Sequence, residues 1–411
     1  MSNTSVPHAR ARDARAVGVV IAALVVLAPA AMHVAARHAK PFVAVDLGTL
    51  GGNFSEASAV TPRGIVVGRS SIADDPTAFH AFVWSAETGM IDLGTLGGGN
   101  QSWATLVADN GMIGGFGFLP GGASFHAFAR TNANGFVDLS TLGGSSSSPS
   151  AINSRGAVVG FSFIENDDAF HAFLWTQRDG MVDLGTLGGR NSQATAINDD
   201  GVVVGVSGTA PDDAPHAFMW TRRSGMVDLG TLGGLDSFAQ GIDDKGVIVG
   251  NSHTASGDNH AFIWTRHTGM VDIGTPGLDS FGEKIADRVA IGQTATPAGP
   301  KHGFAWSQRT GLVDIGTLGG SSSFAAGVND RGLVVGGSFA ANGVFQAFTW
   351  SAATGMEALE SGEGTTQATA INGNFIVGSS CEAGDAICHA TLWKPAPHSR
   401  KDRNRDDNDD D

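Results

Sequence analysis

The chain has 411 residues, of which 42% are hydrophobic and only 16% are charged, and its formal net charge is −15. We expect no nucleic-acid partner, because phosphate binding needs a cationic surface. The 59 glycines indicate many short strands joined by tight turns.

The N-terminal segment predicts a secretory signal peptide over residues 1–36. Three arginines, Arg10, Arg12 and Arg15, precede an uncharged apolar stretch over residues 16–32, and small residues lead to Ala36. We expect cleavage near Ala36 and an exported protein, extracellular or periplasmic, without a membrane span in the mature chain. An uncleaved membrane anchor is the alternative.

The stretch HAFLWTQRDGMVDLGTLGG, residues 171–189, has close copies along the chain at a period of about 44 residues. Each copy predicts four strands. In the copy at 192–233, turn residues separate SQATAIN from a β-branched run at 202–204, and a polar loop at 207–215 leads to an alternating strand and a short last strand. Four antiparallel strands in about 44 residues is the size of one propeller blade.

The number of copies predicts an all-β, single eight-bladed β-propeller over residues 42–395. The third strand occurs eight times, whereas the fourth is missing from the C-terminal end. An additional copy of the fourth strand, at 43–47, precedes the first complete repeat. We expect this N-terminal strand to pair with residues 389–393 of the last blade and close the ring, which removes exposed sheet edges.

The combination of HAF.W, TGM.DLGTLGG and S.A.AIN..G.VVG over roughly residues 43–393 resembles the HAF family of probable extracellular bacterial repeats. The resemblance implies an extracellular, propeller-like protein and supplies no catalytic residue. The arrangement of the strands is also similar to that of WD40-type propellers.

The repeated His, Asp and Ser are interpreted as scaffold. One copy of each per blade is spread around a ring, so successive copies cannot share one ion or form one active site. The remaining alternatives are calcium at an Asp-rich loop and, in the irregular sixth blade, Glu283 as a general acid or base tuned by Lys284. We therefore expect no obligatory cofactor and leave calcium open.

Function is expected on the face that carries the loops before each third strand and the GTLGG crossings. These loops are the longest and most variable, whereas the turns of the opposite face are short. The candidate ligand-binding residues are Asp74, Asp75, Trp103, Asp167, Asp168, Asp212, Asp213 and Asp258.

We interpret the protein as a binding or scaffold module at the cell envelope, where its partner is a glycan or a protein. The alternative is an extracellular glycan-active enzyme with a site at the central channel; we favour binding over catalysis. The shape predicted from the repeats is that of a monomer.

The two cysteines, Cys381 and Cys388, predict a disulfide, because they flank one loop of the last blade and an exported chain meets an oxidising compartment. Residues 396–411 form a charged segment for which we predict disorder.

Overall fold

The computed structural model describes residues 42–396 except 76, 132–134, 361–363 and 385–386. The predicted signal peptide and nearly all of the predicted charged tail therefore lie outside the described residues. All described residues belong to a single unit of the chain.

The described residues form 32 strands, no α-helix and one short 3-10 helix, η1 (Glu165–Asp167). The first strands of the repeats are β2 (Gly51–Val60), β6 (Ser102–Val107), β10 (Gly143–Ile152), β14 (Gly188–Ile197), β18 (Gly233–Ile242), β22 (Ser280–Ala286), β26 (Gly319–Val328) and β30 (Thr365–Asn372). The second strands are β3 (Val66–Ile72), β7 (Ile113–Phe118), β11 (Val158–Ile164), β15 (Val203–Thr209), β19 (Ile248–Thr254), β23 (Val289–Ala295), β27 (Val334–Ala340) and β31 (Phe375–Cys381).

The third strands are β4 (Phe79–Ser85), β8 (Phe125–Thr131), β12 (Phe170–Thr176), β16 (Pro215–Thr221), β20 (Asn259–Thr265), β24 (Lys301–Ser307), β28 (Phe345–Ser351) and β32 (Cys388–Pro395). The fourth strands are β5 (Gly89–Gly94), β9 (Gly135–Asp138), β13 (Gly180–Asp183), β17 (Gly225–Asp228), β21 (Gly269–Asp272), β25 (Gly311–Asp314) and β29 (Gly355–Ala358). β1 (Phe42–Asp46) precedes the first repeat. We number the repeats in chain order from β2–β5 to β30–β32.

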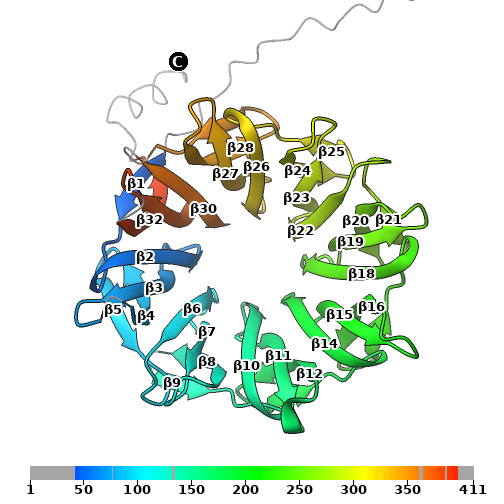
Figure 1. Ribbon diagram of the computed structural model, residues 1–411, viewed down its shortest axis with the longest axis horizontal. Coiled ribbons are helices and arrows are strands. Elements are labelled where there is room, and N and C mark those ends of the chain that lie inside the picture. The colour runs from blue at the N-terminus through cyan, green and yellow to red at the C-terminus, as the bar shows by residue number, and fades with distance from the viewer. Residues whose placement is uncertain (1–41, 76, 132–134, 361–363, 385–386, 397–411) are drawn as a thin grey trace, which may run out of the picture. The chain divides into compact units, whose positions relative to one another are not determined.

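The first seven repeats each form four antiparallel strands in sequence order, as the turn and strand pattern predicts, and the eighth forms three. In Figure 1 the first strands of the repeats lie innermost. The predicted partnership of the N-terminal strand is also confirmed. β1 pairs antiparallel with β32, with Val43 opposite Lys394 and Val45 opposite Leu392.

The predicted count of eight separate sheets is wrong. Strand pairing gives six four-stranded sheets and one eight-stranded sheet, seven in all. The parallel pair Phe54–Cys388 joins β2 to β32, so the first and last strand sets merge. Pairing among the described strands forms no closed ring, because most successive repeats pack through side chains instead of sharing a hydrogen-bonded ladder.

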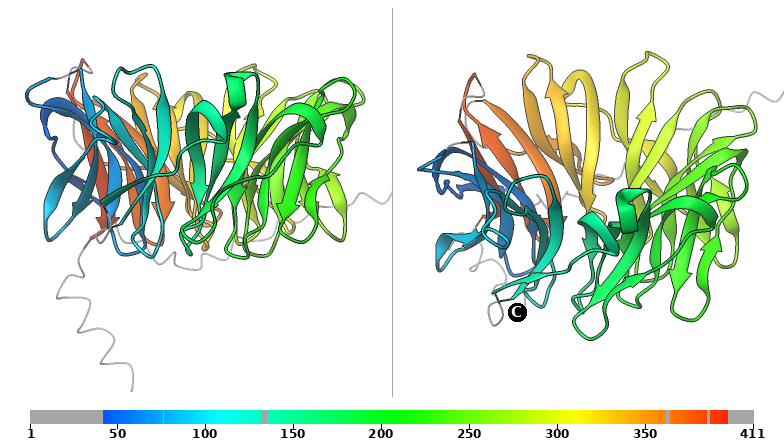
Figure 2. Two further views of the ribbon diagram at one scale, coloured as in Figure 1. Left: turned by 90° about the horizontal axis from the view of Figure 1, so that it is seen from below. Right: turned by 60° about the horizontal axis from the view of Figure 1, so that its bottom comes forward.

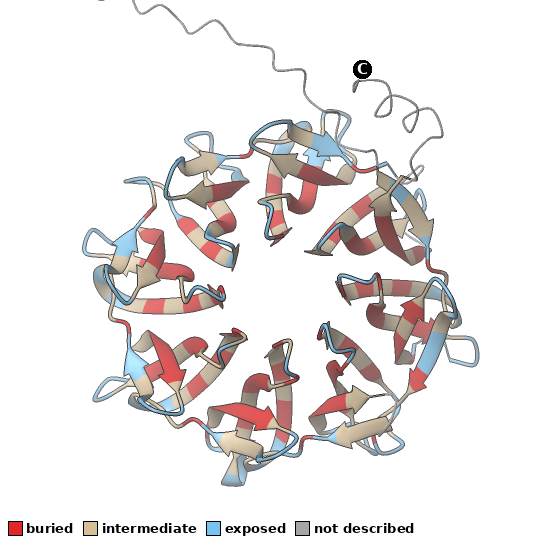
Figure 3. Ribbon diagram, turned by 180° about the vertical axis from the view of Figure 1, so that it is seen from behind, coloured by how far each residue is buried: buried red, intermediate tan, exposed pale blue. Residues whose placement is uncertain are grey.

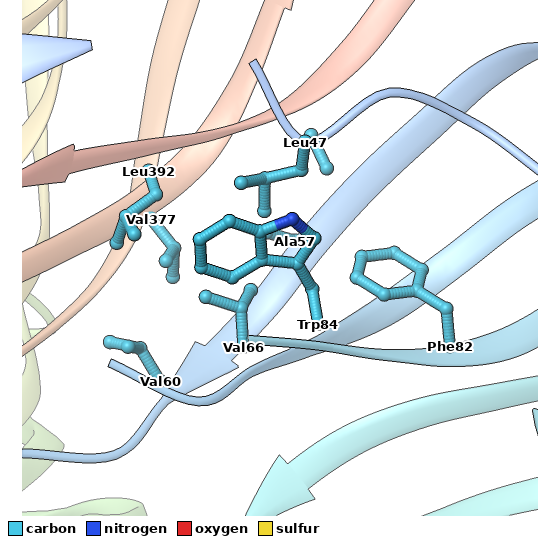
Figure 4. Close-up of a cluster of buried hydrophobic side chains, with 9 residues drawn as sticks. Leu47, Ala57, Val60, Val66, Phe82, Trp84, Val377 and Leu392 are labelled. Atoms are coloured by element: carbon cyan, nitrogen blue, oxygen red, sulfur yellow. The ribbon is translucent and has the colours of Figure 1, made fainter. Parts of the chain in front are cut away.

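The hydrophobic core is divided into clusters between neighbouring repeats, and the sheets stand side by side (Figure 2). Buried residues lie along the strands and exposed residues gather in the loops and outer strands (Figure 3). The Phe of each HAF motif, as at Phe173, is completely buried. Figure 4 shows the cluster in which Leu47, Val66 and Trp84 from the N-terminal part meet Val377 and Leu392 of the eighth repeat.

Candidate functional site

Two sets of connections define the two ends of the sheets. The loop face consists of the loops between second and third strands, such as 165–169 and 210–214, together with the crossings that enter each first strand, such as 184–187. The turn face consists of the turns between first and second strands, such as 198–202, and between third and fourth strands, such as 222–224. The sequence places all eight candidate residues on or next to the loop face.

The repeated His and Asp form seven pairs, six of them within a repeat and one between the eighth repeat and β1. His171 Nδ1 lies 2.8 Å from Asp183 Oδ2, and Asp183 Oδ1 also accepts a hydrogen bond from the Gly185 N–H at 2.7 Å. This carboxylate therefore fixes the third strand and the start of the crossing together. The equivalent pairs are His80–Asp92, His126–Asp138, His216–Asp228, His260–Asp272, His302–Asp314 and His389–Asp46.

The repeated Ser is engaged by the backbone of neighbouring strands. Ser192 Oγ accepts a hydrogen bond from the Ala172 N–H at 2.8 Å and donates one to the Gly185 carbonyl at 2.6 Å. The hydroxyl thus joins the fourth repeat to the third. Its hydrogen bonds are those of a scaffold, as the sequence interpretation expected, and not those of a nucleophile activated by His.

Several candidate aspartates fix the long loops in place. Asp167 Oδ1 accepts a hydrogen bond from the Ser145 N–H, and Asp213 Oδ1 accepts one from the Arg190 N–H, each at 2.7 Å. Both aspartates have a left-handed backbone, with φ of 57° and 58°. These carboxylates are the hydrogen-bond partners of backbone amides near the start of β10 and β14, so part of their negative charge is committed to the fold.

The other candidate aspartates differ in their contacts. Asp75 Oδ1 accepts hydrogen bonds from the Thr77 hydroxyl at 2.6 Å and the Thr77 N–H at 2.9 Å, and these bonds lower the pKa of Asp75. Asp258 Oδ2 accepts a longer bond, 3.3 Å, from the Gly277 N–H. The remaining candidates Asp74, Asp168 and Asp212 are exposed on the loops.

Trp103 belongs to a polar and aromatic cluster between the first and second repeats. The Arg69 guanidinium lies 4.3 Å from the centre of the Trp103 ring and 5.3 Å from that of Phe79. Arg69 also forms an ion pair with Glu56 at 2.9 Å. The Trp103 Nε1 atom is buried and has no hydrogen-bond partner among the described residues.

The sequence interpretation missed Arg69 and Glu56, because they are spaced 13 residues apart on different strands and the repeat has no fixed residue type at either position. The strand register, in which Glu56 lies opposite Arg69, could have suggested the ion pair.

The turn face contains a cavity of about 690 Å³, contrary to the expectation that its short turns could not build a concave site. Seven repeats contribute to its lining, so the small contributions of single turns add up around one space. The ionisable lining residues are Asp109, Asp199, Asp243, Asp244, Lys245, Asp287 and Asp330.

Many polar groups around this cavity are used between successive turns. Asn153 Nδ2 donates to the Asn198 carbonyl, and Asn198 Nδ2 donates to the Asp243 carbonyl, each at 3.1 Å. Asp199 and Asp244 are joined by a backbone-to-carboxylate bond of 2.9 Å. In the described part of the chain, His, Cys, Asp and Glu form no group of three or more that could hold a metal ion.

Glu283 and Lys284 lie on β22 at an irregularity of the strand. Gln293 Nε2 donates to Glu283 Oε1 at 2.9 Å, and Lys284 Nζ donates to the Ala326 carbonyl of the seventh repeat at 2.7 Å. Burial raises the pKa of Glu283, against the opposing effects of Gln293, Lys284 and Lys301. Desolvation lowers the pKa of Lys284, and Glu283 partly offsets it.

The predicted disulfide between Cys381 and Cys388 is present. The two cysteines lie opposite each other on β31 and β32, so the bond closes the loop of the eighth repeat beside the strand that pairs with β1. Among the described residues, no helix has the length and hydrophobicity of a membrane crossing.

Successive four-stranded antiparallel sets with inner first strands and outer fourth strands define the β-propeller fold. No family model matches the chain, so the resemblance to HAF repeats stays a prediction, and no curated protein matches it significantly. Among solved structures, the chain is similar to the β-propeller domain of the Trilobed protease from Pyrococcus furiosus, with 12% identity over 75% of this chain and 97% of that one and a TM-score of 0.49.

Two other solved structures are similar at the same level. A puromycin hydrolase has 13% identity over 87% of this chain and a TM-score of 0.49, and the match spans 61% of the hydrolase chain. A streptogramin B lyase has 12% identity over 86% of this chain and 98% of that one, with a TM-score of 0.43.

Proposed function

We propose that the chain is an exported binding or scaffold module that presents its loop face to a glycan or a protein of the cell envelope. The observation that carries this proposal is the cluster around Trp103, where a half-buried aromatic ring, an arginine and a carboxylate lie together. Sites for small ligands combine aromatic surface with a few polar groups in this way. The disulfide supports export, since such bonds persist in oxidising compartments.

We infer further that the eight repeats complete one closed, eight-bladed ring. Support comes from the contacts between the two ends of the propeller. His389 Nδ1 lies 2.8 Å from Asp46 Oδ2, so the last repeat takes its Asp from the N-terminal strand. The Ala390 N–H donates to Ser55 Oγ at 2.8 Å, which repeats the bond found between successive repeats.

A binding screen with paired variants tests the proposal. The complete exported chain is assayed against a glycan array and against isolated cell-envelope polysaccharide, with and without calcium. Trp103→Ala removes the ring from the loop face, whereas the control variant Arg222→Gln with Arg223→Gln alters exposed residues of the turn face. We expect Trp103→Ala alone to weaken binding by about tenfold, since an aromatic contact of this kind contributes on the order of 1 kcal/mol or more.

The result that would overturn the proposal is a loss of binding in the control variant with Trp103→Ala unaffected, while both variants stay folded. That outcome would place the site on the turn face. Replacing the aspartates of residues 74, 75, 167, 168, 212 and 213 by asparagine tests the loops separately, with the expectation that binding of cationic or calcium-bridged ligands decreases.

The rival function is a glycan-active enzyme, and it depends on Glu283. A raised carboxyl pKa suits a general acid. Gln293, which donates a hydrogen bond to Glu283, also lines a pocket on the loop face. Glycoside hydrolysis needs a second carboxylate, whereas the charged residues that act on the pKa of Glu283 are lysines. Turnover of any glycan that disappears in Glu283→Gln, with binding preserved, would favour the enzyme.

A further inference from the structure

The loop face contains a cavity of about 420 Å³ between the sixth and seventh repeats, distinct from the cavity of the turn face. Gln293 and Lys301 line it from the sixth repeat, and Ser322, Phe324, Phe339 and Phe345 line it from the seventh. Its volume lies in the usual range for small-ligand sites, about 300–1,000 Å³. It is large enough to hold one sugar ring with its substituents.

Aromatic rings form one wall of this cavity. Phe324 and Phe345 are stacked with ring centres 5.7 Å apart, and Phe339 meets Phe345 edge to face at 5.0 Å. Phe339 is 38% exposed, so part of the wall is open to a ligand. A partly exposed aromatic ring of this kind packs well against the apolar face of a pyranose ring.

The sequence of the seventh repeat makes room for this wall. Gly337 on β27 lies opposite Phe324 on β26. At the position equivalent to Gly337, the first three repeats have Arg69, Phe116 and Phe161. A Cβ atom at position 337 would lie only 2.3 Å from Phe345 Cζ, so any other residue would displace the Phe345 ring. The cavity therefore depends on a difference between copies and not on the shared pattern.

The charge of the cavity is opposite to that of the protein. Lys301 is the one ionisable side chain in the lining that the structure describes, and it occupies the position at which four other repeats have Phe. Its Nζ atom lies 4.3 Å from the centre of the Phe281 ring, a contact that fixes the position of the ammonium group. This lysine favours an anionic ligand on a chain of net charge −15, and Glu283, whose pKa Lys301 lowers, is a carboxylate near it that lies outside the lining.

We propose that this cavity binds a carboxylated sugar residue of an acidic polysaccharide. The sugar ring packs on Phe339 and Phe345, the Lys301 ammonium binds the carboxylate, and the hydroxyl of Ser322 hydrogen-bonds to a ring hydroxyl. This inference rests on the proposed binding function, and it deepens that function by naming the ligand class and a second contact point on the same loop face.

The test compares two ligands that share one sugar backbone, one with free carboxylates and one with neutral methyl esters. Trigalacturonate and its fully methyl-esterified form are titrated calorimetrically into the complete chain and into three variants. Lys301→Met removes the charge but keeps the apolar stem, Phe345→Leu removes the ring, and Lys245→Met is the control because it removes a lysine of the turn face. Thermal melts verify that each variant is folded.

We expect the acid to bind at least about tenfold more tightly than the ester, because a carboxylate bound to an ammonium group strengthens a contact by roughly that factor. Lys301→Met should abolish this difference, Phe345→Leu should weaken both ligands, and Lys245→Met should change neither. Equal affinity for acid and ester, or unchanged affinity in Lys301→Met, overturns the inference.

The outcomes separate this inference from the proposed function. If envelope material binds in a manner that needs Trp103 but not Lys301, the inference fails and the binding function stands. If an acidic peptide such as polyglutamate binds through Lys301 and trigalacturonate does not, the saccharide assignment is also wrong. If neither Trp103→Ala nor Lys301→Met affects binding to any envelope fraction, both proposals fail.

Discussion

Replacing the buried hydroxyl of Ser192 should destabilise the contact between the third and fourth repeats. Ser192 is 1% exposed, and its Oγ atom joins the Ala172 N–H to the Gly185 carbonyl. Ser192→Ala leaves the buried Ala172 N–H and the half-buried Gly185 carbonyl without this partner. Each unsatisfied buried group costs about 1–3 kcal/mol, so we expect a loss of about 2–4 kcal/mol in the free energy of unfolding.

Equilibrium unfolding in urea, followed by tryptophan fluorescence, measures this loss, and hydrogen exchange of the Ala172 amide locates it. Ser224→Ala is the matched control, because its hydroxyl makes hydrogen bonds at an exposed turn and its removal should cost less than about 0.5 kcal/mol. Ser192→Thr should lose less than Ser192→Ala, since Thr366 makes the equivalent bond to the Ala347 N–H. If Ser192→Ala unfolds at the same urea concentration as the parent chain and its Ala172 amide exchanges no faster, the hydroxyl is not a structural link.

Three further predictions concern other parts of the chain. Deleting residues 37–52 removes the strand that covers β32 and should lower the unfolding midpoint in urea markedly; equal midpoints for the truncated and full chains would contradict the proposed closure. Reduction of the disulfide between Cys381 and Cys388 should lower the free energy of unfolding by about 2.5 kcal/mol, from the chain-entropy relation for this short loop. The loss should appear as a lower melting temperature, and a variant with both cysteines replaced by serine should melt at the same lowered temperature without reductant. Because the pKa of Glu283 is raised in the folded chain, the folded state binds the proton more tightly than the unfolded state. Acidification from neutral pH down to the ordinary glutamate pKa should therefore stabilise the parent chain relative to Glu283→Gln. If the difference in unfolding free energy between the two chains, measured in urea titrations, does not change with pH, the pKa of Glu283 is not perturbed.

The cavities on the two faces differ in the charge of their linings. The large cavity of the turn face is lined by six aspartates and Lys245, whereas the lining of the small loop-face cavity has Lys301 as its ionisable residue among those described. Their ligands should therefore differ in charge. Raising the salt concentration should weaken an anionic ligand at Lys301 and a cationic ligand at the aspartates alike, so the sign of the ligand's charge indicates which cavity is occupied.

The sequence alone determined the features that depend on short-range pattern. Period-2 alternation and turn residues predicted four antiparallel strands per repeat. The displaced copy of the fourth strand predicted that residues 43–47 pair with residues 389–393, and the structure pairs residues 42–46 with residues 391–395. The cysteine spacing predicted the disulfide at Cys381 and Cys388. These predictions succeeded because each one requires only local backbone preferences or, for the disulfide, two cysteines at the two ends of one loop.

The tertiary structure decided how the repeats meet, because contacts between repeats join residues about 44 positions apart whose identities the repeat does not specify. The candidate Asp167 and Asp213 proved to be hydrogen-bonded to backbone amides of the first strands β10 and β14, which no charge pattern indicates. The merging of the first and last strand sets depends on one parallel pair, Phe54–Cys388. Likewise, the pocket beside Lys301 exists because Gly337 leaves space for an aromatic ring, and a missing Cβ atom gains this meaning only once the neighbouring strands are in place.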